Sequence, residues 1–234
     1  MEYAALTDVG IKRHNNEDSY IVNEANNIYI VADGMGGHNA GEIASLEACR
    51  IIESYILHNK GDIADVLREA VVKANRDIFV RAAENSSMQG MGTTIDACVV
   101  RDGVINIAHV GDSRVYIISK DSVRKVTRDH SVVGMMLEEG SITEEEAKNH
   151  PQRNYITRAV GSTITVDVDI VKEKLHDGEW VLMCTDGLTN MVSENVILSV
   201  VTGSKSASEG AGELVRLAKE NGGDDNITVV LLKV

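Results

Sequence analysis

The fold is decided by residues 94–126, which read TIDACVVRDGVINIAHVGDSRVYIISKDSVRKV. This stretch contains four short apolar or alternating runs, at residues 94–100, 104–110, 115–118 and 123–126. Such runs predict β-strands. Gly103 separates the first two runs and Lys120-Asp121 separates the last two, as expected for tight hairpin turns. The stretch therefore predicts antiparallel strands joined by hairpins.

The chain on either side adds more strands and two blocks of helices. Six further apolar runs predict strands at residues 3–6, 20–22, 28–32, 166–171, 180–184 and 228–232. Apolar residues three or four apart predict helices over 44–55 and 63–78, and again over 197–201 and 207–218. Because the helices come in blocks rather than after every strand, we expect an α+β fold with helices on the outer faces of antiparallel sheets.

The composition fits one globular domain. The chain has 234 residues, 43% of them hydrophobic and 25% charged, close to the average for such domains. No repeat or proline-rich linker divides it, so we expect a single domain over residues 1–234. Residues 131–155 are acidic, and Thr143 and Glu146 have the spacing of a helix capping box. We expect this segment to be an inserted flap of short helices.

Charge and residue usage exclude several kinds of partner. Asp and Glu outnumber Lys and Arg by 36 to 23, and only 3% of residues are aromatic. Basic surfaces and aromatic platforms serve nucleic-acid and membrane binding, so we expect no nucleic acid and no membrane partner. No apolar run is long enough for a membrane span, and the first residues lack the features of a signal peptide. Cys49, Cys98 and Cys184 are expected to be reduced core thiols of a cytoplasmic protein.

Four acidic residues stand at the ends of apolar runs. They are Asp33, Asp112, Asp186 and Asp225. Each alone is equally well explained as a turn residue that accepts backbone hydrogen bonds. Four together, without a matching group of Lys or Arg, favour a bound cation, because buried carboxylates need a counter-charge. A set of hard oxygen ligands favours Mg²⁺ or Mn²⁺ over zinc.

The N-terminal segment carries further charged candidates. Glu17 and Asp18 would either join the metal centre through water or form the exposed end of a loop. Arg13 is either a surface residue or a clamp for phosphate oxygens. Other phosphate chemistries do not fit, because the glycine-rich segment after Asp33 lacks the third glycine of a dinucleotide fingerprint and no Gly-Lys-Ser/Thr loop occurs. No cysteine is followed six positions later by the arginine that a cysteine-nucleophile phosphatase needs.

The sequence resembles the metal-dependent serine/threonine protein phosphatases, the PPM or protein phosphatase 2C family, in its compact bacterial form. The matching motifs run in family order along nearly the whole chain: Thr7-Asp8, Arg13, Asn16-Glu17-Asp18, Asp33-Gly34-Met35-Gly36-Gly37, Gly92-Thr93-Thr94, Gly111-Asp112-Ser113-Arg114, Asp129-His130-Ser131, Thr157-Arg158-Ala159-Val160-Gly161, Thr185-Asp186-Gly187-Leu188 and Asp224-Asp225-Asn226-Ile227-Thr228. The resemblance implies a four-layer αββα sandwich, in which two antiparallel sheets are flanked by pairs of antiparallel helices.

The resemblance also implies how the metal ions are held. Asp33 would bridge two ions, with Asp186 and Asp225 completing the ligands of the first and the Gly34 carbonyl helping to hold the second. Asp112 and Asp186 would bind a third ion. The implied reaction is hydrolysis of phosphoserine or phosphothreonine by direct attack of a water or hydroxide that bridges two Mn²⁺ or Mg²⁺ ions.

Other residues are assigned around this centre by the same resemblance. Glu17 and Asp18 would contact the water shell of the second ion, and Arg13 would hold the substrate phosphate. Family members from higher organisms have a His directly after the Asp-Gly pair to protonate the leaving oxygen, where this chain has Met35. The leaving-group acid is therefore open: His38 either contacts the substrate or caps the following helix, and a water on the third metal is the other candidate.

Several functions are consistent with parts of this pattern. The leading hypothesis is a cytoplasmic, monomeric phosphatase that acts on phosphoserine and phosphothreonine proteins, including a Ser/Thr protein kinase that it opposes. One alternative keeps the metal site but hydrolyses phosphodiesters or small phosphate esters. A non-enzymatic phosphoprotein-binding domain would have lost ligands, whereas the family's metal positions and Arg13 are intact here. A sporulation or stress phosphatase would have a reduced flap, which the full segment 131–155 disfavours.

Overall fold

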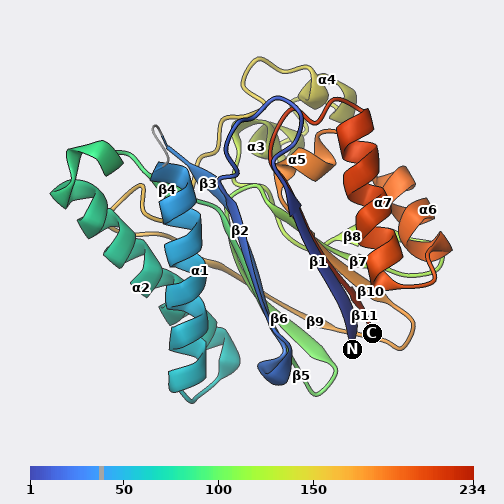
Figure 1. Ribbon diagram of the computed structural model, residues 1–234, viewed down its shortest axis with the longest axis horizontal. Coiled ribbons are helices and arrows are strands. Elements are labelled where there is room, and N and C mark those ends of the chain that lie inside the picture. The colour runs from blue at the N-terminus through green and yellow to red at the C-terminus, as the bar shows by residue number, and fades with distance from the viewer. Residues whose placement is uncertain (37–39) are drawn as a thin grey trace.

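Two antiparallel sheets form the centre of the computed structural model, which describes residues 1–36 and 40–234 (Figure 1). The first sheet has the order β1-β11-β10-β7-β8, with bounds Glu2–Asp8, Ile227–Lys233, Trp180–Cys184, Arg114–Ile118 and Val123–Lys125. The second has the order β2-β3-β5-β6-β9, with bounds Asp18–Asn23, Ile28–Met35, Ile95–Arg101, Val104–Val110 and Asp169–Lys174. A two-residue strand, β4 (Gly92–Thr93), pairs with the end of β3.

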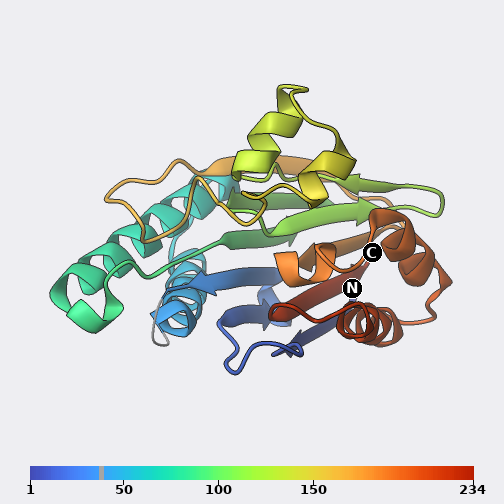
Figure 2. The ribbon, with the colours of Figure 1, turned by 90° about the horizontal axis from the view of Figure 1, so that it is seen from above.

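Helices cover the outer face of each sheet (Figures 1 and 2). The pair α1 (Ala40–His58) and α2 (Ile63–Glu84) lies against the β2-β3-β5-β6-β9 sheet, and the pair α6 (Glu194–Gly203) and α7 (Ala207–Glu220) lies against the other. Shorter helices are α3 (Val132–Glu138), α4 (Glu144–Lys148), α5 (Asp186–Thr189) and the 3-10 turns Glu24–Asn26 and Ser86–Met88. The predicted four-layer αββα fold is confirmed. None of the helices in the part of the chain that is described has the length and apolarity to cross a membrane.

Period-two alternation gives each sheet two buried faces. On β3, Ile28 and Ile30 belong to the core under α1 and α2, whereas Tyr29 and Val31 belong to the core between the sheets. The strand β10 behaves in the same way, with Met183 pointing between the sheets and its neighbours toward α6 and α7. Both faces are therefore apolar, which is why these strands appear as continuous apolar runs in the sequence. The three cysteines are buried and free, as predicted.

The predicted hairpins form, but one predicted strand is displaced. Asp102 and Gly103 turn from β5 to β6 with φ values of 51° and 71°, the left-handed geometry that suits a two-residue hairpin. The strand predicted at 166–171 is instead β9, Asp169–Lys174. The carbonyls of Asp167 and Val168 accept hydrogen bonds from the side chains of Arg158 (3.3 Å) and Arg68 (2.7 Å) instead of joining a ladder. The apolar alternation at 166–168 therefore reflects burial and not strand pairing.

Residues 131–155, termed the flap segment, hold α3 and α4 and lie over one edge of the sandwich (Figure 2). The segment is closed at its base by a β-bridge between Ser131 and Ile156, and the Val132 N–H donates to the Tyr155 carbonyl at 2.9 Å. The predicted capping box is present, because the Thr143 hydroxyl accepts from the N–H of Glu146 and the Glu146 carboxylate accepts from the N–H of Thr143.

Candidate metal and phosphate site

Ends of strands from both sheets meet at one end of the sandwich and enclose a cavity of about 250 Å³. Seven residues expected in the site line it: Arg13, Glu17, Asp33, Gly34, Asp112, Asp186 and Asp225. Met35, Gly36, Thr94, Asn154, Ile156 and Asn226 complete the lining. The four strand-end aspartates thus come together in space, although they are spread over 193 positions of the chain between Asp33 and Asp225. We call this cavity the carboxylate pocket.

Asp33 lies near the end of β3 and is held through its backbone. Its N–H donates to the Thr94 hydroxyl at 2.9 Å, and its carbonyl accepts from the Thr94 N–H and the Thr93 hydroxyl, both at 2.9 Å. These bonds form because β4 pairs with the last residues of β3. The Asp33 backbone is thereby fixed at the edge of the pocket, which the residue lines.

Asp186 is the first residue of α5 and is separated from β10 only by Thr185. Its Oδ2 accepts from the side-chain amide of Asn190 at 3.0 Å, while its Oδ1 is buried and has no hydrogen-bond partner. A β-carbon at Gly187 would overlap with the Asn226 carbonyl, so only glycine lets α5 start this close to the chain before β11. The unpartnered oxygen needs a positive group, because a buried carboxylate without one is costly.

Asp225 precedes β11 and pairs with the predicted phosphate clamp. Its Oδ2 accepts from Arg13 Nη2 at 2.7 Å, and its Oδ1 accepts from the Asn226 N–H at 2.8 Å. Burial opposes the charged form of Arg13, but the Asp225 carboxylate outweighs burial and raises the arginine pKa. The Arg13 side chain remains 54% exposed, so it can reach an anion at the mouth of the pocket.

Asp18 takes a different position from its neighbour Glu17. It opens β2 opposite Asp33, but its side chain lies beneath the pocket, where Oδ2 accepts from the hydroxyls of Thr185 (2.9 Å) and Thr228 (2.7 Å). Asp18 therefore joins β2 of one sheet to β11 of the other and to Thr185, the residue directly after β10. Glu17 lines the pocket itself, which follows from the alternation of side chains along an extended chain.

The carboxylates raise one another's pKa values because they share a buried space. Burial is the main cause, and the charges of neighbouring aspartates add to it. The pKa of Asp33 is raised well above its ordinary value of 3.8, that of Asp186 is raised by burial and by Asp225, and those of Asp18 and Asp112 are raised to about 7. Burial also raises the pKa of Glu17. A divalent cation would relieve this repulsion directly.

The residues present fit divalent cations in their chemistry. The donors are oxygens only, and one carboxylate oxygen of Asp186 is buried without a partner. Within residues 1–36 and 40–234, no three acidic, His or Cys side chains are already arranged around a single ion position, and the Asp225 carboxylate is engaged by Arg13. The fit therefore rests on the donor set and its burial rather than on a preformed coordination shell.

Comparison with known proteins decides the family. A family model described as Protein phosphatase 2C matches residues 11–220. The chain belongs to the protein phosphatase 2C family. The serine/threonine phosphatase stp of Listeria welshimeri is 39% identical over 235 residues, which cover 97% of this chain and 93% of that protein.

Solved structures agree with this assignment. A serine/threonine phosphatase of S. agalactiae matches with a TM-score of 0.94 and 38% identity, covering 100% of this chain and 99% of that one. The catalytic domain of the phosphatase PstP, solved in complex with two manganese ions, matches with a TM-score of 0.89 and 34% identity over 98% and 96% of the two chains. The resemblance seen in the sequence motifs is confirmed.

The sequence motifs of this phosphatase 2C chain include Asn226, but they revealed neither its role nor the part that Asn154 and Ile156 play in the pocket. Asn226 accepts from the Glu17 N–H at 2.8 Å and donates to the carbonyls of Val9 (3.0 Å) and Asn15 (2.9 Å), so it anchors the loop that carries Arg13. Its place directly after Asp225 was the available signal. Asn154 is near the end of the flap segment and Ile156 directly follows it, and no local pattern connects either residue to the pocket. The predicted substrate contact His38 lies outside the described residues.

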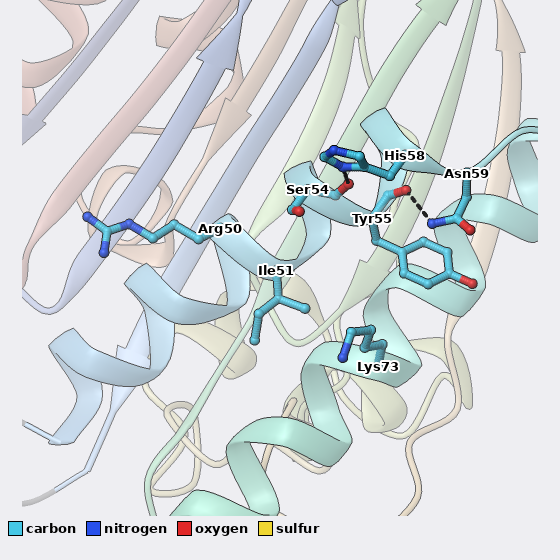
Figure 3. A pocket seen from close by; sticks show the side chains of 7 residues that line it. All are labelled: Arg50, Ile51, Ser54, Tyr55, His58, Asn59 and Lys73. Carbon is cyan, nitrogen blue, oxygen red and sulfur yellow. Dashed lines mark hydrogen bonds between the residues drawn. The ribbon is translucent and has the colours of Figure 1, made fainter.

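A second hollow on this phosphatase 2C domain is unsuited to metal. It measures about 480 Å³ and lies on the outer side of α1 and α2 (Figure 3). Its lining consists of Arg50, Ile51, Ser54, Tyr55, His58, Asn59 and Lys73. None of these residues carries a carboxylate, so the hollow offers no charged oxygen to a cation. The carboxylate pocket is therefore the candidate active site, despite its smaller volume.

Proposed function

We infer that this chain is a metal-dependent phosphatase that removes phosphate from serine and threonine residues of proteins. The observation that carries the inference is the carboxylate pocket itself, in which half-buried aspartates surround a space that also has an arginine at its mouth. The family and its named serine/threonine phosphatases support the substrate class. Mn²⁺ is a fitting cofactor because PstP binds two manganese ions on the same fold, and Mg²⁺ prefers the same oxygen donors.

Different residues of the pocket would bind the metal ions and the phosphate. Asp33, Asp186 and Asp225 would hold two ions, and Asp112 with Asp186 would hold a third. When bound, such ions supply Lewis acidity that activates water and neutralises phosphate charge. Arg13 is the cationic side chain of the described lining and is largely exposed, so a phosphate that approaches such ions passes this side chain.

Arg13 orients the phosphate group. A guanidinium presents parallel N–H donors that match two phosphate oxygens, and the Asp225 carboxylate keeps this guanidinium charged and turned toward the pocket. Asn226 holds the loop before Glu17, so the reach of Arg13 is set by backbone contacts as well as by the ion pair. Met35 cannot donate a proton, and the lining of the described chain holds no His or Lys that would replace it.

The cellular setting is a finer part of the same proposal. Phosphoproteins are the substrate class, and a Ser/Thr protein kinase whose products the enzyme dephosphorylates would be its functional counterpart. The net charge of −13 suits a soluble cytoplasmic monomer, because like charges oppose self-association. The flap segment contributes Asn154 to the pocket, and Ile156, the residue directly after the segment, also lines it. The flap segment therefore lies close to the residues that flank a bound phosphoserine or phosphothreonine.

Hydrolysis of a phosphothreonine peptide tests the proposal. Phosphate release is measured with Mn²⁺, Mg²⁺ or chelator for the wild type, Asp33→Asn and the exposed control Asp121→Asn. We expect release that requires metal, survives in Asp121→Asn and falls by about 10³-fold or more in Asp33→Asn. Hydrolysis of bis-p-nitrophenyl phosphate at a higher kcat/KM than the peptide would favour a phosphodiesterase. No metal-dependent release from the peptide would refute the proposal.

A further inference from the structure

A histidine outside the carboxylate pocket is bonded to the turn that carries Asp112. The backbone N–H of Gly111, the residue before Asp112, donates to His130 Nδ1 at 3.0 Å. In return, the His130 backbone N–H donates to the Gly111 carbonyl at 2.7 Å. Gly111 has φ +116°, and a β-carbon there would lie 2.6 Å or less from Thr94 side-chain atoms. The turn is therefore held between His130 on one side and Thr94 on the other.

The same histidine forms the base of the flap segment. The His130 carbonyl accepts from the Thr157 N–H at 2.7 Å, and the next residue, Ser131, forms the β-bridge to Ile156. Ile156 lines the carboxylate pocket. One residue thus connects the entry of the flap, its exit and the turn before Asp112.

The hydrogen bonds fix the protonation of His130. Because Gly111 N–H can only donate, Nδ1 must accept, and the ring proton of a neutral imidazole is then on Nε2. That nitrogen lies 3.3 Å from Asp169 Oδ2, to which it donates. Arg158 Nη1 lies 3.0 Å from Nε2 and donates to Asp169 Oδ1 at 2.8 Å, so both donors share the Asp169 carboxylate.

A second, fully buried histidine packs against His130 and favours its neutral form. His109 lies against His130 with ring centroids 4.7 Å apart. Its two nitrogens lie 2.7 Å from Asp96 Oδ1 and 2.8 Å from the Arg128 carbonyl. Burial opposes the charged ring, but the Asp96 carboxylate outweighs burial and raises the pKa of His109, which favours the cationic form. Burial and the nearby charge of His109 lower the pKa of His130 to about 4, which agrees with a neutral His130 whose Nδ1 accepts.

We propose that His130 is a positioning residue that ties the base of the flap segment to the Gly111-Asp112 turn and so fixes the Asp112 carboxylate in the pocket. The proposal rests on the proposed function for its kinetic consequences, but its structural content does not. Removal of the imidazole leaves the Gly111 N–H without its acceptor and leaves the base of the flap attached to this turn only through the backbone. Removal of a residue that orients a metal-binding group typically lowers metal affinity or activity by about 10- to 100-fold.

Three variants separate positioning from simple stability. His130→Ala removes both ring contacts, and His130→Asn keeps a side-chain oxygen that can accept from Gly111 N–H. The matched control is His176→Ala, an exposed histidine in the turn between β9 and β10. We expect His130→Ala to lower kcat on a phosphothreonine peptide by about 10- to 100-fold, with KM changed less than about threefold, and His130→Asn to recover about tenfold of the loss.

Two measurements do not depend on activity. Hydrogen exchange of the 111–113 and 131–155 segments in chelator should accelerate more than about tenfold in His130→Ala and not in His176→Ala. Titration with Mn²⁺, followed by electron paramagnetic resonance, should show weakened binding of the last ion only. Absence of phosphatase activity in the wild type would defeat the proposed function, while the exchange data would still decide the positioning role.

The positioning role would be overturned by any of three results. The first is unchanged exchange in His130→Ala. The second is a loss of thermal stability in His130→Ala with kcat and Mn²⁺ affinity within about twofold of the wild type. The third is equal impairment of His130→Asn and His130→Ala, because the acceptor for Gly111 N–H would then be irrelevant.

Discussion

Replacing Asp112 by Asn should stabilise the metal-free protein at alkaline pH. Asp112 is half-buried beside Asp186, and desolvation together with the Asp186 charge raises its pKa from the ordinary 3.8 to about 7. A group with a raised pKa in the folded state favours folding at low pH and loses that contribution as the pH climbs through the folded value. At pH 8 the ionised carboxylate therefore destabilises the fold, whereas a neutral amide of the same shape does not.

The magnitude follows from that pKa difference. Each unit of pKa difference is equivalent to ~1.4 kcal/mol, so the raised pKa of Asp112 destabilises the folded state by about 4 kcal/mol at pH 8. Because the aspartates titrate together, protonation is shared between Asp112 and its neighbours. We therefore expect Asp112→Asn to raise the free energy of unfolding by about 2–4 kcal/mol at pH 8. At pH 5 the folded carboxyl group is already protonated, and the gain should shrink by about 2–3 kcal/mol.

Urea unfolding in chelator at pH 5 and pH 8 measures these gains for the wild type, Asp112→Asn and the exposed control Asp121→Asn. Addition of Mn²⁺ at pH 8 should reverse the order, because only the wild type then gains the full binding free energy of the ions. An Asp112→Asn variant that is no more stable than the wild type at pH 8 in chelator would refute the reasoning. So would a gain of equal size at both pH values.

Other predictions concern the clamp, the backbone and the flap. Arg13→Ala should raise KM for a phosphothreonine peptide by about tenfold or more and weaken inhibition by inorganic phosphate; unchanged inhibition would contradict a phosphate clamp. Gly161→Ala should lower the free energy of unfolding in urea by about 2–4 kcal/mol, because φ is +86° and the new methyl overlaps with Ile78. Unchanged stability would show that the backbone around residue 161 adjusts to the methyl group. Thr143→Ala should cost about 1 kcal/mol locally, seen as faster hydrogen exchange of α4 at unchanged global stability. Asn226→Ala should lower kcat/KM and speed exchange in residues 9–17 together, whereas either effect alone would argue against its anchoring role.

Features set by local pattern were predictable from the sequence. Continuous apolar runs gave the strands that are buried on both faces, and the ends of those runs located Asp33 and Asp186. The buried pair of Asp96 and His109 could also have been predicted, because a two-residue hairpin at Asp102-Gly103 places these residues opposite each other. This pair was nevertheless not among the predicted features.

Features set by the stacking of the sheets were not predictable. Asp18 was grouped with Glu17 because the two are adjacent, yet its partners Thr185 and Thr228 come from the other sheet. Nothing in a single strand specifies which hydroxyls a second sheet will present to it. The contacts of the flap segment with the pocket share this difficulty, since they depend on how residues 131–155 return to Ile156.

The central claim is that the carboxylate pocket holds divalent cations, and Mn²⁺ binding at equilibrium tests it most directly. Electron paramagnetic resonance counts free and bound Mn²⁺ for the wild type and for Asp33→Asn, with Asp121→Asn as the control. We predict that the wild type and the control bind two or three ions and that Asp33→Asn loses at least one of them. A wild type that binds no Mn²⁺ in the millimolar range, or an Asp33→Asn variant with undiminished binding, would contradict the account.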